Sequence, residues 1–182
     1  NELNALPNCK DGNNDEADIA TIKDFYTNKM DGDLFLRTYA VNVILGMWDD
    51  YWINNNNFYF YFDTNGKAYF IPYDYDNVLG VNGIGIDSAK HNPLEWGSLS
   101  DGNRPLIQKI LQVPEYMEAY KSYLDEYSNE DSYFDDDKSI TRIKKWHEMI
   151  KPYIYGNKLN YDFEQPNTDR YCGVYKEIAD FP

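Results

Sequence analysis

Basic residues are scarce in this sequence. Its 182 residues include 17 Lys and Arg against 31 Asp and Glu, which gives a formal net charge of −14. This balance argues against nucleic acid as a partner, because the phosphate backbone is bound by Lys and Arg. Three interpretations of the acidity stay open: a solvated acidic surface, a cation-dependent site, and a basic protein substrate.

Long hydrophobic runs and cysteines are also few. No apolar run approaches the roughly 20 residues that a membrane-spanning helix needs, so we expect no membrane span. The only cysteines are Cys9 and Cys172. A disulfide between them would contribute about 4–5 kcal/mol in the chain-entropy model, and the sequence leaves both the paired and the free state open. There is no internal repeat, and the only low-complexity segment is Asn54–Asn57.

What the sequence does contain is enough apolar material for a folded core. Hydrophobic residues make up 42% of the chain and aromatic residues 17%, with 18 tyrosines among them. We expect one domain portion spanning 1–182, although two small lobes are an alternative. Within it we expect an irregular lead-in over 1–15, a helical lobe with a hairpin over 16–155, and a tail over 156–182.

Helical periodicity dominates this lobe. Apolar residues at helical spacing predict an α+β, mostly helical fold. Asp33 is a candidate N-cap for a buried central helix. The segment between Gly80 and Arg104 is expected to be a long loop, and Asp135–Asp137 to lie in an acidic connection. The predicted helices span residues 16–29, 34–48, 105–111, 114–127 and 139–154.

A β-hairpin is the firmest local prediction. The runs Phe58–Phe62 and Ala68–Tyr73 are rich in aromatic and branched residues that favour strands. Between them, Asp63–Gly66 supplies turn chemistry, and Asn65 and Gly66 are expected to take positive φ values. Tyr59, Tyr61 and their neighbours are expected to serve packing of the hairpin rather than sugar stacking.

The hairpin predicts a site at its open end. Antiparallel pairing brings the residues before the first strand beside those after the second. Asp49, Asp50 and the Asn54–Asn57 run should therefore converge on Asp74 and Asp76. Clustered carboxylates need a compensating positive charge, and a hard divalent cation with oxygen ligands supplies it.

Each of these groups has a functional and a purely structural interpretation. Asp49 or Asp50 would act as a general base or would orient a nucleophile, or would belong to a polar loop after a helix. Asn57 would turn its amide oxygen to the metal, or the Asn run would form a turn. Asp74 and Asp76 would face the same way on an extended segment and chelate one cation, or would cap the strand end.

Several of these motifs resemble the CotH family, which comprises spore-coat and extracellular proteins related to atypical protein kinases. The resemblance covers roughly Asp33 to Ile154 and includes a helical stretch between residues 105 and 116. Its core consists of FLRTYAVN at 35–42, the Asp before the Asn cluster, NFYFY at 57–61, and FIPYDYD at 70–76 followed by Gly80.

The resemblance implies a kinase-like catalytic lobe that uses ATP and Mg²⁺, Mn²⁺ or Ca²⁺. Asp49 would match the aspartate that orients the substrate hydroxyl, and Asn57 the metal-binding asparagine. Asp74 would match the metal-chelating aspartate, with Asp76 as a second ligand. The expected function is phosphoryl transfer to Ser or Thr of secreted or coat proteins. Location outside the cell, on its surface or in a spore coat follows from the same resemblance.

One part of the kinase pattern is missing. No glycine-rich loop and no strand-borne lysine precede Asp49, so the sequence corresponds to the second lobe of such a kinase. The alternative function is a surface adhesion module, or a binding module associated with polysaccharide degradation, without catalysis. The aromatic excess suits such a sugar or protein contact.

Overall fold

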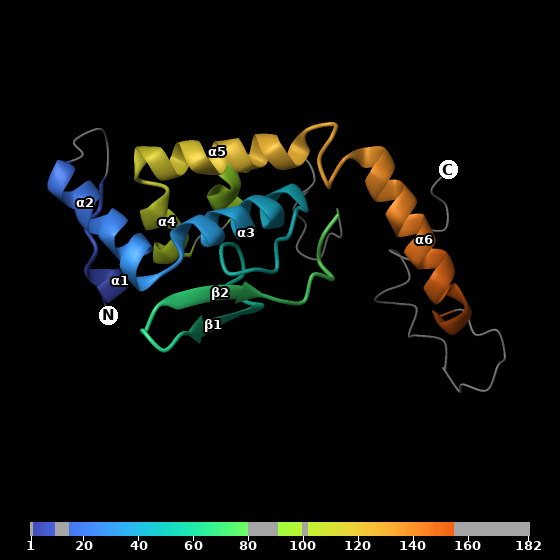
Figure 1. Ribbon diagram of the computed structural model, residues 1–182, viewed down its shortest axis with the longest axis horizontal. Coiled ribbons are helices and arrows are strands. Elements are labelled where there is room, and N and C mark those ends of the chain that lie inside the picture. The colour runs from blue at the N-terminus through green and yellow to red at the C-terminus, as the bar shows by residue number, and fades with distance from the viewer. Residues whose placement is uncertain (1, 10–14, 80–90, 100–101, 155–182) are drawn as a thin grey trace. The chain divides into compact units, whose positions relative to one another are not determined.

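The computed structural model describes residues 2–9, 15–79, 91–99 and 102–154. The chain divides into two compact units, Asn1–Ser128 and Asn129–Pro182. The first unit contains the hairpin and every predicted site residue. Its elements, shown in Figure 1, are α1 (Glu2–Ala5), α2 (Glu16–Asp24), the π-helical turn η1 (Phe25–Lys29), α3 (Gly32–Ile44), β1 (Phe58–Phe62), β2 (Ala68–Pro72), the 3-10 helix η3 (Pro93–Leu99), α4 (Pro105–Ile110) and α5 (Pro114–Ser128).

The second unit is described through one helix, α6 (Asp136–Ile154). Asp136 and Asp137 lie in its first turn rather than in a connection, and the Asp135 carboxylate accepts a 2.9 Å hydrogen bond from the Lys138 N–H. Acidic side chains are favourable at this end because the helix dipole is positive there. The predicted tail lies outside the described residues.

The predicted fold class is confirmed: the described chain is mostly helical and carries a two-stranded antiparallel hairpin. Helix α1 lies within the lead-in that we expected to be irregular. The buried Lys109 ammonium on α4 holds this segment, since its Nζ donates to the carbonyl oxygens of Leu6 at 2.7 Å and Pro7 at 2.6 Å. Cys9 is a buried free thiol, and Cys172 lies outside the described residues.

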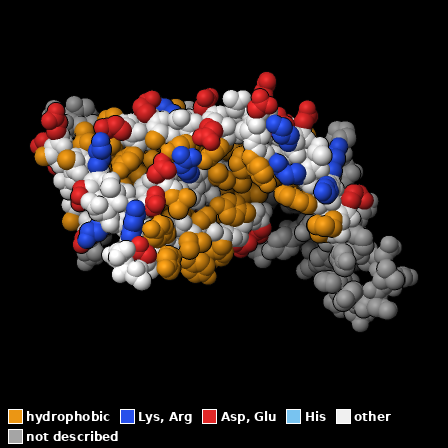
Figure 2. Space-filling view, viewed as in Figure 1, with side chains coloured by type: hydrophobic (Ala, Val, Ile, Leu, Met, Phe, Trp, Pro, Cys, Tyr) orange, Lys and Arg blue, Asp and Glu red, His pale blue; other side chains and the backbone are white. Residues whose placement is uncertain are grey.

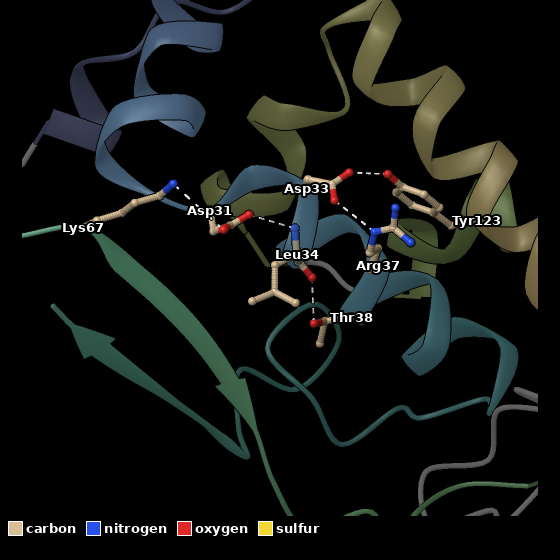
Figure 3. A network of polar contacts seen from close by, with 7 residues as sticks. All are labelled: Asp31, Asp33, Leu34, Arg37, Thr38, Lys67 and Tyr123. Atoms are coloured by element: carbon tan, nitrogen blue, oxygen red, sulfur yellow. Dashed lines mark hydrogen bonds and ion pairs between the residues drawn. The ribbon is translucent and has the colours of Figure 1, made fainter.

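Helix α3 is the central element of the first unit. Its buried face packs against α5 and β2 and contributes side chains such as Phe35 and Tyr39 to the core. The helix begins two residues earlier than predicted, at Gly32, and its N-cap is Asp31, not Asp33. The Asp31 carboxylate accepts the Leu34 N–H at 3.0 Å (Figure 3). This interaction satisfies one of the backbone donors that a helix leaves free at its start.

Asp33 instead links α3 to α5. Its carboxylate accepts hydrogen bonds from Arg37 Nε at 2.9 Å and from the Tyr123 hydroxyl (Figure 3). The Arg37 guanidinium lies over the Tyr123 ring, 4.2 Å from its centroid. Hydrogen bonding to Tyr123, followed by the interaction with Arg37, lowers the pKa of Asp33.

The hairpin has the predicted strands, with the second ending one residue earlier, at Pro72. Phe58 pairs with Pro72 and Phe62 with Ala68. In the turn, Gly66 has a φ of 80°, whereas Asn65 is not among the residues of positive φ. The Asp63 carboxylate accepts the Asn65 N–H at 2.8 Å, so the asparagine is held through its backbone and the glycine alone takes the left-handed conformation.

The two faces of the hairpin carry different aromatic residues. Phenylalanines occupy the even positions of β1, and Phe70 of β2 lies buried against the rings of Phe58 and Tyr39. Tyr59 and Tyr61 occupy the odd positions and are exposed. The phenylalanine face therefore anchors the hairpin to the core, as the period of two along a strand requires. No helix in the described ranges is long and apolar enough to cross a membrane.

Candidate functional site

The site loop, residues 45–57, begins where α3 ends. Gly46 has a φ of 67°, and the N–H groups of Gly46 and Met47 donate back to the carbonyls of Val43 and Asn42 at 3.0 and 2.9 Å. This pattern is a Schellman cap, in which a glycine in the left-handed region stops the helix. The cap explains why α3 ends at Ile44, before the predicted limit at Trp48, and turns the chain toward the hairpin.

Asp50 organises this loop from inside the protein. Its side chain is only 1% exposed and accepts hydrogen bonds from the Ile53 N–H at 3.0 Å and the Asn42 amide at 3.3 Å. Its backbone carbonyl accepts the N–H groups of Asn54 and Asn56, both at 3.1 Å. Asp50 thus links helix α3 to the second half of the loop.

Burial changes the pKa of Asp50. It raises the pKa of this carboxyl from 3.8 to about 6, although the hydrogen bonds from Ile53 and Asn42 act in the opposite direction. Asn42 also accepts the Tyr75 hydroxyl at 2.8 Å. Burial, followed by the charge of Asp50, raises the pKa of Tyr75 to about 12, so this hydroxyl remains a donor at neutral pH.

Asp49 faces the opposite way, toward the asparagine run. Its carboxylate accepts the amide of Asn54 at 2.6 Å, of Asn56 at 3.3 Å, and of Asn57 at 3.0 Å. The Asn57 amide also donates to the Asp49 carbonyl at 2.9 Å. Residue Asn57 is buried and has a φ of 54°, a conformation that asparagine tolerates better than most residues.

The segment after β2 closes the site from the other side. We expected it to be extended, but Asp74 has a φ of 59° and the chain turns there. Left-handed conformations of non-glycine residues cost free energy and occur often at functional sites. The turn brings Asp76 near Asp49. The Asn77 amide lies between them and donates to the Asp76 carboxylate at 2.7 Å and to the Asp49 carboxylate at 3.5 Å.

The three carboxylates of the site lie close enough to affect one another. Partial burial, followed by the negative charges of Asp74 and Asp49, raises the pKa of Asp76. In the described part of the chain, none of the ion pairs involves these three aspartates. The site therefore concentrates negative charge that no described Lys or Arg neutralises by direct contact.

The donor chemistry of the site fits a hard divalent cation. Carboxylate and amide oxygens are the ligands that Mg²⁺ and Ca²⁺ prefer, and an asparagine presents oxygen instead of nitrogen after a half-turn of its amide. The carboxylates are not gathered as for a bound ion, since no three His, Cys, Asp or Glu side chains within the described ranges are grouped closely enough to hold a metal. Cation binding would require the carboxylates to move closer together and the amides that donate to Asp49 to reorient.

Sequence reasoning placed Asp49, Asp50, the Asn54–Asn57 run, Asp74 and Asp76 at one end of the hairpin. The structure brings Asp49, Asn57 and Asp76 together there, whereas the Asp50 side chain is buried in the protein. Sequence reasoning did not identify Asn77, which bridges two of the carboxylates, or the Asn42–Tyr75 pair behind Asp50. The position of Asn77, directly after an acid at a strand end, was the available signal for the first. Asn42 ends the FLRTYAVN segment of the family resemblance, but nothing in its local sequence indicates contacts with Asp50 and Tyr75.

A comparison with protein families shows to which family the chain belongs. The model described as "CotH kinase protein" matches residues 4–182, and the chain belongs to this family. No solved structure matches it.

Two relatives come from the fungus Rhizopus delemar. "Spore coat protein homolog 1" is 27% identical over 160 residues, which cover 79% of this chain and 25% of the relative. "Invasin CotH7" is 26% identical over 157 residues, which cover 79% of this chain and 26% of the relative. The chain thus matches about a quarter of the length of either relative.

Proposed function

We propose that this chain forms the acceptor-orienting and metal-binding part of a CotH-type protein kinase. The reaction would transfer the γ-phosphoryl group of ATP to a Ser or Thr hydroxyl of a secreted or coat protein. One observation carries the proposal: Asp49, from the loop after α3, meets Asn57 and Asp76 at the open end of the hairpin. An acid, an amide and a second acid in this arrangement provide what phosphoryl transfer requires, namely positioning and charge neutralisation.

The residues would divide the work as follows. Asp49 would accept the proton of the attacking hydroxyl and orient it, which requires the carboxylate to leave at least one of its amide partners. Asn57, Asp74 and Asp76 would hold the divalent ion, which when bound neutralises the phosphate oxygens. Asp50 was a second candidate for the catalytic role, but its buried carboxylate supports a positioning role for the loop that carries Asp49.

The proposed function goes with a location outside the cell. The names of the two relatives refer to a spore coat and to an invasin, and we propose a cell-surface, extracellular or spore-coat location for this chain as well. A secreted or coat protein would then be its substrate. The second candidate function, a non-catalytic adhesion or polysaccharide-associated module, is favoured by the exposed tyrosines of the hairpin, Tyr59 and Tyr61.

Two substitutions separate the proposed roles of Asp49 and Asp74. In a protein that contains this chain together with the nucleotide-binding part, Asp49→Asn and Asp74→Asn should each lower divalent-dependent phosphate incorporation by about 10²-fold or more. In the 182-residue chain, Mg²⁺ or Mn²⁺ should still raise the melting temperature of the Asp49→Asn variant but not that of Asp74→Asn.

The matched control is Asp125→Asn, which removes one negative charge from an exposed position on α5. It should leave both readouts unchanged. Unchanged phosphate incorporation in the Asp49→Asn or Asp74→Asn variant would contradict the assigned role. Binding of soluble glucans by wild type, with no response to nucleotide and divalent cation, would support the non-catalytic alternative.

A further inference from the structure

In the part of the chain that the structure describes, one edge of strand β1 has no partner strand. Within the described ranges, β1 pairs only with β2. Figure 1 shows β1 as the outer strand, with β2 between it and helix α3, which contacts β2. A strand edge presents N–H and C=O groups that can pair with another chain, so proteins protect exposed edges with charged residues, proline or bulges.

The edge of β1 has none of these protections. Its sequence is FYFYF, without charge, proline or glycine. Tyr59 is 60% exposed, Tyr61 56% and Phe62 63%. Figure 2 shows hydrophobic side chains gathered over the hairpin, whereas charged side chains are spread over the helices. In a chain with a net charge of −14, an uncharged aromatic edge stands out as a contact surface.

The hydrogen bonds of the hairpin show which residues face the free edge. The N–H of Tyr73 donates to the carbonyl of Asn57 at 3.0 Å, and the N–H of Asp63 donates to the carbonyl of Lys67 at 3.0 Å. Backbone groups of an antiparallel strand alternate between its two edges. The odd-numbered residues of β1 therefore face β2.

The N–H and C=O groups of the even-numbered residues, Phe58, Phe60 and Phe62, consequently point away from β2. They form the row of donors and acceptors that a further strand would meet. All three are phenylalanines, so the residues at this edge are the same in either direction along the strand.

The sequence of β1 is a palindrome centred on Phe60. Antiparallel pairing with a second copy would place Phe58 opposite Phe62 of that copy and Phe60 opposite itself. These are the residues whose backbone groups face the free edge, so the register satisfies their hydrogen bonds on both strands. Tyr59 would lie opposite Tyr61. Each cross-strand pair then joins two like aromatic residues, which is a favourable combination.

We propose that β1 is a self-association surface, through which two copies of this chain form a symmetric dimer with a continuous four-stranded sheet of order β2-β1-β1-β2. A two-fold interface must be complementary to itself, and a palindromic edge strand meets this condition. The proposal is independent of phosphoryl transfer. Because each copy carries a charge of −14, the two repel, and association should strengthen as salt screens this repulsion. Capture of a basic peptide would weaken with salt instead.

The register can be tested with paired charges. Tyr59→Lys with Tyr61→Lys would place two lysine–lysine pairs across the dimer axis, whereas Tyr59→Lys with Tyr61→Glu would place two lysine–glutamate pairs there. Both variants lose the same tyrosines and keep the same neighbours on β2. Sedimentation equilibrium of the 182-residue chain should show the wild type passing from a 21.4 kDa monomer to twice that mass. The double-lysine variant should dissociate on the order of tenfold more readily than the lysine–glutamate variant.

Amide hydrogen exchange provides a second readout. As concentration rises, exchange at Phe60 and Phe62 should slow, while Tyr61, whose N–H faces β2, should stay constant. A wild-type chain that remains monomeric at high concentration and high salt would overturn the proposal. So would a dimer in which the two charge variants dissociate equally, because the contact would then lie elsewhere. Circular dichroism of both variants would confirm that they are folded.

Discussion

Two adjacent aspartates, Asp49 and Asp50, have opposite environments. Asp50 is buried and bound by one backbone N–H and one amide, whereas Asp49 faces four asparagine side chains near the other carboxylates of the site. The loop turns one of these neighbouring acids into the protein and the other toward the site. Asp50 therefore supports the loop from inside, and the loop holds Asp49 in the site.

The buried member of the pair should make stability depend on pH. Burial raises the pKa of Asp50 from 3.8 to about 6. Between these values the folded chain holds a proton that the unfolded chain has released, so the folded state loses stability as pH rises through this window. The loss attributable to Asp50 is on the order of 2–3 kcal/mol.

Asp50→Asn removes this titration. The free energy of unfolding of wild type relative to the variant, measured with urea at about pH 4 and about pH 7, should fall toward the higher pH. Asp125→Asn is the control, because it makes the same chemical change at an exposed position. A flat difference for Asp50→Asn would show that the carboxyl titrates alike in the folded and unfolded chain.

At the scale of elements, the sequence predicted the existence of helices and strands better than their ends. The hairpin strands were predicted almost to the residue, because alternating aromatics and a glycine turn specify them locally. The start of α3 was predicted less well, because Asp31 and Asp33 are both plausible caps and the choice between them depends on the backbone conformation. The turn at Asp74 was missed for the same reason: a positive φ at an aspartate is set by its surroundings.

The candidate site divides in the same way. Hairpin geometry brings its two halves together, so the convergence of Asp49 with Asp76 was predictable from strand pairing. The inward orientation of Asp50 and the bridge through Asn77 depend on side-chain packing between elements distant in sequence. Such contacts leave no periodic pattern in a single sequence.

The cap of α3 can be tested with two substitutions at one position. Asp31→Ala removes the acceptor for the Leu34 N–H and should lower the free energy of unfolding by about 1 kcal/mol. Asp31→Asn retains an acceptor and should cost only a few tenths, although it removes the charge that lies 3.9 Å from Lys67. Urea denaturation would measure both. Equal losses would assign the contribution of Asp31 to its charge rather than to capping.

At the scale of the whole molecule, the core and the site belong to the same unit. The buried cluster extends from Leu6 to Tyr120, with partly buried side chains up to Tyr127 packed against it. The unit Asn1–Ser128 thus contains every residue of the candidate site and of the hairpin. A chain of this length can bury a core of its own.

A chain that ends at Ser128 should therefore fold. We expect cooperative thermal unfolding, because the aromatic cluster around Tyr39 and Phe70 is complete in this unit. Under the proposed function it should also respond to Mg²⁺ or Mn²⁺ with a rise in melting temperature that Asp74→Asn abolishes. Differential scanning calorimetry of the shortened chain, with and without the cation, measures both properties. A broad, non-cooperative transition would show that residues after Ser128 are required for the core, whereas a cooperative transition without a cation response would count against the metal site and leave the fold intact.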